Sequence, residues 1–363
     1  MIYDCVIIGA GLSGLYAAYN LRQSGAECVL LEARDRLGGR IFSPKPATLA
    51  ATPSARYDLG AAWVWPSFQP LIHQLIETLG LSVFPQFTEG AALYQEHPSA
   101  ELLQIQGPSP HEASKRLVSG AGYLIDTLST HIPARHIRLN QQVTGIENTG
   151  KNLKISVNHE GGQYTLAAYR VILAMPPHQI ATHIQFTPDL PTALKNWLET
   201  TPTWMAAHAK LIALYSRPFW REQGLSGECF SRHAPLTEIY DASPAQNGPY
   251  ALFGFYGFNA SERLDIGQES LVKQGIAQLA NTFGKQASQP LEYFFKDWSR
   301  SPFTATLADQ DALRTHPEYG LGALARSYWD NQLILAGSET APLHGGYLEG
   351  ALEAASLATH LIQ

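Results

Sequence analysis

The strongest constraint on the fold is a glycine triad near the start of the chain. Gly9, Gly11 and Gly14 follow the apolar, β-branched stretch 2–8 and precede residues 15–21, whose apolar positions have helical spacing. Side chains at these glycines would keep a phosphate away from the backbone N–H groups at the start of the helix. The segment therefore predicts a nucleotide-binding turn in a mainly parallel sheet.

A second strand and an acidic residue complete this unit. Residues 27–32 are typical of a buried strand, and Glu32 at its end lies eighteen residues after Gly14. A carboxylate placed there can accept hydrogen bonds from both hydroxyls of a ribose. Ser13 offers a further hydroxyl donor. The competing interpretation is a purely structural glycine turn followed by a surface glutamate.

Composition excludes several classes of protein. The 363 residues carry a net charge of −6 without a block of Lys or Arg, so no nucleic-acid partner is expected. Only 15% of residues are charged and 45% are hydrophobic, which favours a buried sheet. We expect no export signal, and no apolar run reaches the roughly 20 residues of a membrane span. This length predicts two domains with a cleft between them.

Cysteine and histidine spacing narrows the chemistry. Cys5, Cys28 and Cys229 lack any CxxC spacing, so neither a disulfide framework nor a zinc site is expected, and a reducing cytoplasm is the predicted location. The 13 His residues show no metal-binding spacing, so no metal is predicted. The chain also lacks a GxSxG elbow and a Walker loop, which argues against these routes to hydrolysis and phosphoryl transfer.

Periodicity predicts the remaining elements. Between residues 81 and 116 the pattern is broken and rich in proline, and no element is assigned. Elsewhere we expect a helix over 71–79, a hairpin over 138–159, a short strand over 171–174, strands over 210–215 and 250–255, a helix over 269–283, a strand over 332–336 and a helix over 347–361.

Residues 31–40 separate FAD from NAD as the cofactor. The run Leu-Glu-Ala-Arg-Asp-Arg-Leu-Gly-Gly-Arg resembles the extended fingerprint of FAD enzymes of the glutathione-reductase structural class. In that resemblance Gly39 lets the chain turn against the cofactor, and Arg40 can pair with its phosphates in a bidentate way. Arg34 is assigned to the cofactor too, although solvated loop charges are an equal alternative for Arg34 and Arg36.

From this point the sequence resembles the flavin-containing amine oxidase family along most of its length. Residues 58–63, Asp-Leu-Gly-Ala-Ala-Trp, are similar to the family's loop along the flavin edge. The resemblance assigns Gly60, Ala61, Ala62 and Trp63 to the cofactor, with core packing as the alternative for Trp63. Val143 matches the strand residue whose backbone contacts adenine.

One strand carries the most discriminating match. Residues 208–220 resemble the strand on which the family holds its active-site lysine, which makes Lys210 the implied catalytic residue. A lysine in an apolar strand is costly without a partner, and the implied partner is a water held against flavin N5. The alternative is a strand-edge lysine that reaches out to solvent.

The C-terminal segment resembles the family's second flavin motif. Glu339 would bind the ribityl chain, and Gly346, Tyr347 and Leu348 would lie at the start of a helix aimed at the flavin N1–C2=O edge. Such a helix end contributes about 0.3–2 kcal/mol, so it tunes the cofactor and does not supply the chemistry.

Two facing aromatic rings are a further feature of the family. Phe303 and Tyr347 match these positions and are predicted to be catalytic, with two core aromatics as the alternative. Trp298 matches a tryptophan near the flavin. Pro302 stands where covalently flavinylated members have cysteine, so the resemblance implies non-covalent FAD.

Together these observations predict an α/β fold with two domains. A Rossmann-like, glutathione-reductase-class FAD domain would be assembled from residues 1–80, 117–185 and 299–363, and a mixed-sheet substrate domain from 81–116 and 186–298. The family commonly has a long helical insertion where this chain has only residues 81–116. An open site, a lid from another subunit of a homo-oligomer, or a bulky substrate would follow from this.

The resemblance implies an FAD-dependent amine oxidase. A hydride equivalent would pass from a small-molecule amine to flavin N5, O2 would reoxidise the flavin and give hydrogen peroxide, and the imine would hydrolyse. Two alternatives stay open: an FAD-dependent desaturase or dehydrogenase of the same architecture, whose patterns generally lack the Lys210 strand, and a catalytically silent FAD-bound interaction module. Primary amines, polyamines and amino acids all stay open as substrates.

Overall fold

The structure is a computed structural model that describes residues 2–47, 55–97, 100–233, 235–245, 248–311, 313 and 315–362. Its helices are α1 Leu12–Gln23, α2 Pro70–Thr78, α3 Ala121–Thr130, α4 Pro177–His183, α5 Thr192–Thr200, α6 Phe219–Glu222, α7 Ala260–Ile266, α8 Gln268–Phe283 and α9 Leu348–His360. Short 3-10 turns include η3 Trp298–Arg300, η4 Leu307–Asp309 and η5 Ser338–Thr340.

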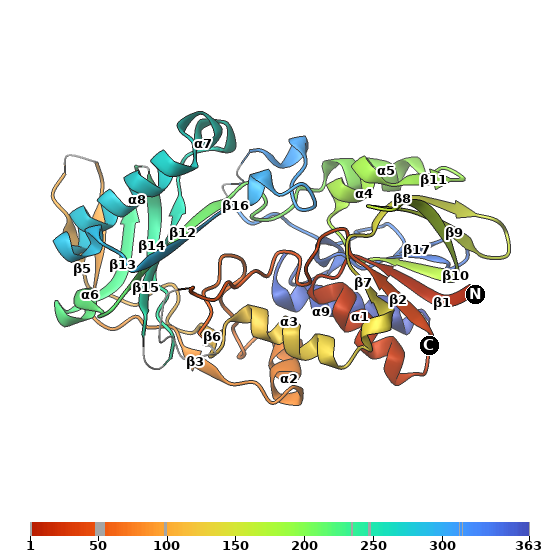
Figure 1. The fold of residues 1–363 in the computed structure, drawn as a ribbon, viewed down its shortest axis with the longest axis horizontal. Helices are drawn as coiled ribbons and strands as arrows, with labels where there is room; N and C mark the ends of the chain where they lie inside the picture. The colour runs from red at the N-terminus through yellow and green to blue at the C-terminus, as the bar shows by residue number, and fades with distance from the viewer. Residues whose placement is uncertain are drawn as a thin grey trace.

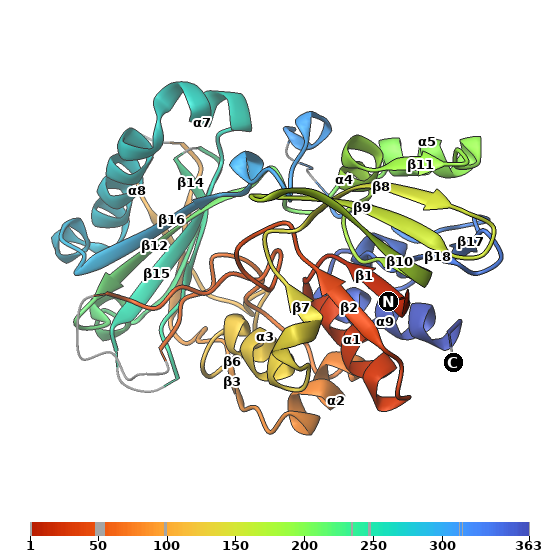
Figure 2. The ribbon, with the colours of Figure 1, turned by 45° about the vertical axis from the view of Figure 1, so that its right-hand side comes forward.

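Two large sheets form the body of the protein. The first sheet contains β1 Ile2–Ile8, β2 Cys28–Leu31, β7 Ile137–Arg138, β8 Gln142–Asn148, β9 Leu153–His159, β10 Gly162–Leu173, β11 Gln185–Thr187, β17 Ser327–Tyr328 and β18 Leu333–Leu335. The second sheet contains β4 Ala91–Gln95, β5 Leu103–Ile105, β12 Ala209–Tyr215, β13 Leu225–Ser231, β14 Leu236–Asp241, β15 Tyr250–Tyr256 and β16 Glu292–Asp297. A small pair joins β3 Val83–Pro85 to β6 Lys115–Leu117. In Figures 1 and 2 the two large sheets lie at opposite ends of an elongated molecule.

The parallel part of the first sheet is built around β1. Strand β1 pairs in parallel with β2 and β10, and β10 pairs in parallel with β18, so the two ends of the chain meet in one sheet. These strands are almost fully buried because helices cover both faces. The predicted α/β class is confirmed.

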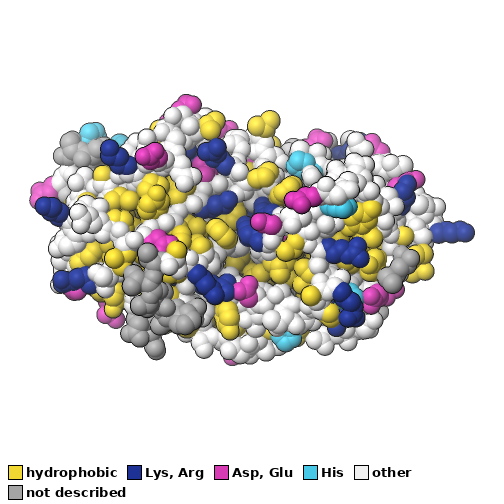
Figure 3. All heavy atoms as spheres, in the orientation of Figure 1, with side chains coloured by type: hydrophobic (Ala, Val, Ile, Leu, Met, Phe, Trp, Pro, Cys, Tyr) yellow, Lys and Arg dark blue, Asp and Glu magenta, His cyan; other side chains and the backbone are white. Residues whose placement is uncertain are grey.

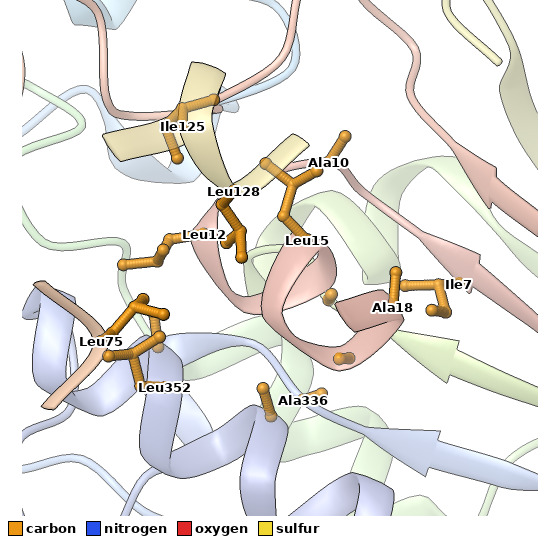
Figure 4. Packing of buried hydrophobic residues seen from close by; sticks show 14 of the residues in the cluster. Ile7, Ala10, Leu12, Leu15, Ala18, Leu75, Ile125, Leu128, Ala336 and Leu352 are labelled. Atoms are coloured by element: carbon orange, nitrogen blue, oxygen red, sulfur yellow. The ribbon is translucent and has the colours of Figure 1, made fainter. Parts of the chain in front are cut away.

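Helix α1 forms the centre of the packing on one face of this sheet. Figure 4 shows Leu12 and Leu15 of α1 among side chains from α2, α3 and α9, including Leu128 and Leu352. Burial of each such leucine stabilises the fold by about 1.5–3 kcal/mol. Helices α4 and α5 pack on the other face, with Leu194 and Leu198 in a second apolar cluster. The glycine turn before α1 is therefore supported by packed elements on both faces of the sheet.

Most of the elements predicted from periodicity are confirmed, and two predictions need correction. The strand expected over 171–174 is the end of the twelve-residue β10, whose first half pairs with β9 and whose polar, alternating residues disguise it. The stretch 81–116 contains four short strands, of which β4 and β5 extend the second sheet beside β13. Strands of three to five residues leave too short a pattern to recognise.

Charged side chains are spread over the surface, and the helices are short. The face in Figure 3 carries acidic and basic side chains interspersed around a central band of apolar ones. Within the described ranges, none of the helices combines the length and apolar character needed to cross a bilayer.

Candidate active site

One cavity of about 450 Å³ runs from the first sheet to the second. It is lined by every residue that the sequence predicted for the site except Gly14: Gly9, Gly11, Ser13, Glu32, Arg34, Gly39, Arg40, Gly60, Ala61, Ala62, Trp63, Val143, Lys210, Trp298, Phe303, Glu339, Gly346, Tyr347 and Leu348. Residues far apart in the sequence thus meet around one elongated space.

The glycine turn is shaped by close backbone contacts. Gly9 has a φ of +100°, and its N–H donates to the carbonyl of Leu31 at 2.8 Å. A Cβ on Gly14 would lie 1.9 Å from the Gly9 oxygen, so Gly14 lets α1 pack against the turn and does not line the cavity. The N-cap residue Gly11 has no side-chain cap, which leaves the N–H groups at the start of α1 available to a phosphate.

Glu32 lies at the carboxyl end of β2 with 3% of its surface exposed. One carboxylate oxygen accepts the N–H of Ala10 at 2.7 Å, and the other accepts the N–H of Arg34 at 3.0 Å. These bonds orient the carboxylate beside the glycine turn, where a ribose of a bound dinucleotide would lie.

Arg34 contacts Phe303 at this end of the cavity. The Arg34 guanidinium lies 3.5 Å from Glu32, donates to the Thr304 hydroxyl at 2.6 Å and stands 5.7 Å from the centre of the Phe303 ring. Burial lowers the pKa of Arg34, with Glu32 opposing the effect. Arg34 is therefore a packed wall residue, and the alternative of a solvated loop charge does not describe it.

Phe303 and Tyr347 both line the cavity, and their predicted pairing in front of the flavin stays a prediction. The ring that stacks on Tyr347 is His316, with centroids 4.6 Å apart and an interplanar angle of 10°. Trp65 meets Tyr347 edge-on at 6.3 Å. The chain between Trp298 and the last strand is irregular, so spacing alone could not show which ring reaches Tyr347.

A buried acidic side chain, that of Glu339, lines the cavity. Glu339 has no exposed surface and pairs with Arg40 at 2.7 Å. Arg40 also donates to the Ser338 hydroxyl at 2.8 Å. Ser13 was predicted to offer a further hydroxyl donor, and its hydroxyl donates to the carbonyl of Ala336, directly after β18.

Lys210 reaches the cavity from the middle of the second sheet. It lies on β12, where every residue is buried, and only 3% of its surface is exposed. Its Nζ donates to the carbonyls of Asp58 and Gly60 at 3.1 and 3.0 Å. Lys210 therefore does not reach out to solvent: it holds the loop of residues 58–63.

The surroundings of Lys210 change its acidity. Nζ lies 4.5 and 4.9 Å from the ring centres of Phe253 and Phe255. Burial lowers the pKa of Lys210 to about 7, against the opposing effect of Asp58, while Arg116 adds to the lowering. Neutral and charged forms of Lys210 therefore coexist near neutral pH, as a proton-transfer group requires.

Loop 58–63 is fixed by several further contacts. The indole N–H of Trp298 donates to the carbonyl of Leu59 at 3.0 Å, and that of Trp63 donates to Gln86 at 2.9 Å. A Cβ on Gly60 would lie 1.9 Å from the carbonyl oxygen of Arg40. Trp63 thus presents a ring to the cavity, which favours its assignment to the site over simple core packing.

Glu238 and His111 are two polar residues of the cavity wall that the sequence did not single out. Glu238 and Lys210 are both paired with Phe255, on opposite sides of β15, so all three lie in one row on the same face of the second sheet. The Glu238 carboxylate accepts the hydroxyl of Tyr240 at 2.8 Å. His111 comes from the unassigned stretch 81–116. Only strand register and loop contacts place these residues in the site.

The residues of this cavity fit FAD. The glycine turn with its uncapped helix start suits a pyrophosphate, and buried Glu32 suits a ribose. The N-cap of α9, Tyr347, also has no side-chain cap, so its helix start can face an electron-rich ring edge. Among the residues that the structure describes, no cluster of His, Cys, Asp or Glu is arranged to bind a metal ion.

Family models match most of the chain. The model described as "Flavin containing amine oxidoreductase" matches residues 98–362, and "NAD(P)-binding Rossmann-like domain" matches residues 7–79. A probable flavin-containing monoamine oxidase A of Dictyostelium discoideum is 24% identical, over 97% of this chain and 95% of that protein. Amine oxidase [flavin-containing] A of Sus scrofa is also 24% identical, over 99% of this chain and 84% of that protein.

Solved structures share the fold. Putrescine oxidase in a wild-type form bound to putrescine aligns with a TM-score of 0.80 and 21% identity, over 100% of this chain and 99% of that one. Cyclohexylamine oxidase from Brevibacterium oxydans aligns with a TM-score of 0.82 and 20% identity, over the same shares. With the family model covering residues 98–362, the chain belongs to the flavin-containing amine oxidoreductases, FAD-dependent enzymes that act on amines.

Proposed function

We propose that this protein is an amine oxidase in which Lys210 serves the oxidation of a C–N bond. The observation that carries the proposal is a buried lysine with a pKa near 7 that faces the cavity beside loop 58–63. When bound, FAD would supply the redox chemistry, with the amine α-carbon as the source of a hydride equivalent and O2, reduced to hydrogen peroxide, as the final electron acceptor. The imine product then hydrolyses to a carbonyl compound and ammonia or an amine.

The hydrogen bonds of Lys210 suggest its role in proton movement. A neutral lysine has two N–H groups, and the carbonyls of Asp58 and Gly60 provide two acceptors. The lone pair is then free to accept a proton from the substrate ammonium or to hold a water molecule. Because a substrate amine gives up hydride only in its neutral form, such a base near the reacting carbon promotes the reaction.

The other site residues bind and orient. We propose that Glu32, Arg34 and Phe303 surround the adenosine end of FAD, with the Val143 backbone near adenine. Gly9, Gly11, Gly39 and Arg40 would hold the pyrophosphate, and Glu339 the ribityl chain. Gly60, Ala61, Ala62, Trp63, Trp298, Gly346 and Leu348 would surround the flavin ring. Tyr347 would form an aromatic wall of the substrate chamber.

Pro302 supports non-covalent binding of FAD, because it offers no thiol for a thioether. We also propose that the body around the first sheet binds FAD and that the second sheet forms most of the substrate wall. Cys5, Cys28 and Cys229 are buried and free, which supports a reducing, cytoplasmic location.

Glu238 suggests which amines bind best. Its carboxylate lies in the same row of the second sheet as Lys210, two strands away, which corresponds to about 10 Å between backbones. A substrate with a second cationic group could place one nitrogen near Lys210 and the other near Glu238. The putrescine oxidase that shares this fold is bound to putrescine, a diamine. Glu238→Gln should raise KM for diamines and leave KM for monoamines of equal length nearly unchanged.

Anaerobic mixing of the FAD-loaded enzyme with a panel of amines tests the proposal. Bleaching of the flavin absorbance, followed by peroxide release on admission of O2, is the expected result. If no amine reduces the flavin while another electron acceptor supports turnover of a different substrate, the chain is a dehydrogenase or desaturase. If no substrate reduces it at all, a silent FAD-bound module is the better description.

A further inference from the structure

His111 is a cavity residue that the proposed chemistry does not use. Its ring stacks on Trp63, with centroids 3.9 Å apart and an interplanar angle of 18°. The same ring meets Tyr240 edge-on at 4.9 Å and lies 6.2 Å from Trp65. His111 therefore fills the space between three aromatic rings that come from loop 58–63, the residues just after it, and β14.

The turn that carries His111 is tied to the second sheet. The hydroxyl of Ser109 donates to the buried carboxylate of Glu228 on β13, and the N–H of His111 donates to Ser109 at 3.0 Å. On the other side, the N–H and hydroxyl of Ser114 donate to the carbonyl of His111 at 2.9 and 2.8 Å. These bonds fix the backbone of the turn without help from a ligand.

A second pair of bonds joins this turn to the loop that holds Trp63. Val64 and Lys115 exchange backbone hydrogen bonds of 2.9 and 2.8 Å. Two sets of hydrogen bonds, one to the second sheet and one between Val64 and Lys115, thus support the segments that carry His111 and Trp63. Separation of the two backbone segments would break these hydrogen bonds, so the backbone that carries each ring is held in place.

The His111 imidazole is uncharged, which suits a site that binds amines. Burial lowers the pKa of His111 to about 4, so the imidazole is neutral at physiological pH. A neutral ring does not repel the ammonium form of an arriving substrate. Its Nδ1 is buried and has no hydrogen-bond partner among the described residues, so the ring presents mainly a flat surface.

We propose that His111 is a specificity-determining residue whose ring forms the end wall of the substrate chamber and limits the length of the amine's substituent. The proposal rests on the amine oxidase function proposed above. The short stretch 81–116 then supplies a wall of its own through one aromatic ring. Compact amines fit against this ring, and longer alkyl chains collide with it.

Replacement of the ring tests the wall. For a series of straight-chain primary amines, His111→Ala should raise the ratio of kcat/KM for long over short amines by about tenfold or more, because single methylene contacts in a pocket discriminate by such factors. The change should appear mostly in KM, since the contact lies away from the reacting carbon. His111→Phe keeps a flat ring and should keep the wild-type preference.

Binding of the same amines provides a readout that does not require turnover. Each amine is titrated into the FAD-loaded enzyme and its variants, and Kd is measured from the change in the flavin spectrum or by calorimetry. If amines bind with the expected length dependence but never reduce the flavin, the proposed function fails and the wall is supported. His73→Ala, on the exposed side of α2, is the matched control and should behave as wild type.

Two outcomes would overturn the proposal. In the first, His111→Ala keeps its FAD and melting temperature but shows the wild-type dependence of both Kd and kcat/KM on chain length. In the second, His111→Phe shifts the preference as far as His111→Ala does, which would show that the ring itself is not the barrier.

Discussion

Replacement of Lys210 by methionine should remove its contribution to catalysis and leave the fold intact. Methionine keeps an unbranched, apolar side chain of similar length, so β12 should still pack. The variant loses two hydrogen bonds to the carbonyls of Asp58 and Gly60, each worth about 0.5–1.5 kcal/mol. The variant also avoids the free energy that the wild type spends on burying a charged amine.

The lowered pKa gives the size of this cost and its pH dependence. The fall from the ordinary value of 10.5 to about 7 corresponds to roughly 5 kcal/mol. Between these two values the unfolded chain binds more protons than the folded one, so the stability contributed by Lys210 rises with pH across this window and is lowest below pH 7. Between pH 6 and pH 9 the free energy of unfolding of the wild type should therefore rise by roughly 3 kcal/mol more than that of Lys210→Met.

The expected result is a yellow, folded variant that reacts slowly. Stopped-flow reduction by a saturating amine should slow by a factor on the order of 10². The wild-type rate should fall as pH drops below about 7, and the variant should lack this limb. Lys154→Met makes the same change at a half-exposed lysine on β9, outside the cavity lining, and should react at close to the wild-type rate.

Two measurements decide the role of Lys210. Unchanged reduction kinetics in a variant with full FAD content would remove it from the chemistry. An unchanged difference in unfolding free energy between pH 6 and pH 9, measured by chemical denaturation, would show that the buried amine is not neutral near pH 7.

Three further substitutions test the cofactor end of the cavity. Glu32→Ala leaves the Ala10 N–H without its acceptor, at a cost of about 1–3 kcal/mol, and should lose FAD on purification; a stoichiometric visible spectrum would contradict this. Gly14→Ala places a Cβ 1.9 Å from a turn carbonyl and should lower stability by about 1–3 kcal/mol, unlike Gly145→Ala, whose nearest neighbour lies at 3.6 Å; equal melting temperatures would refute the close contact. Phe303→Ala should raise Kd for FAD more than KM for the amine, and the reverse pattern would return Phe303 to the substrate wall.

The cofactor half of the site was accessible from sequence because its residues lie close to strand ends and turns with fixed geometry. Gly9 and Glu32 directly follow β1 and β2, and Glu339 lies four residues after β18, all in the parallel part of one sheet. Their separation in space is set by strand pairing, and the spacing of the motif already contains that geometry. Long-range pairing of β18 with β10 was the one additional fact needed.

The substrate half was harder because its residues meet only through tertiary contacts. Lys210 was found through a family pattern, but Glu238 joins it only through the register of β12, β15 and β14. His111 lies in a turn held by side-chain hydrogen bonds to β13. Phe303 lies in an irregular part of the chain beside Arg34, a contact that no periodicity encodes, and its pairing with Tyr347 stays a prediction.

Loop 58–63 connects the cofactor end of the cavity to the substrate end. Lys210 of β12 and Trp298 of η3 donate hydrogen bonds to the carbonyls of this loop. On the other side, Gly60 packs on the carbonyl of Arg40 in the cofactor wall. FAD that binds only the folded arrangement stabilises it by RT ln(1 + [FAD]/Kd), about 2.7 kcal/mol at a hundredfold excess over Kd. Because the loop belongs to both walls, part of this free energy is available to keep Lys210 in place beside the flavin edge. The buried lysine, which costs the fold several kcal/mol when charged, is thus tolerated where cofactor binding can offset its cost.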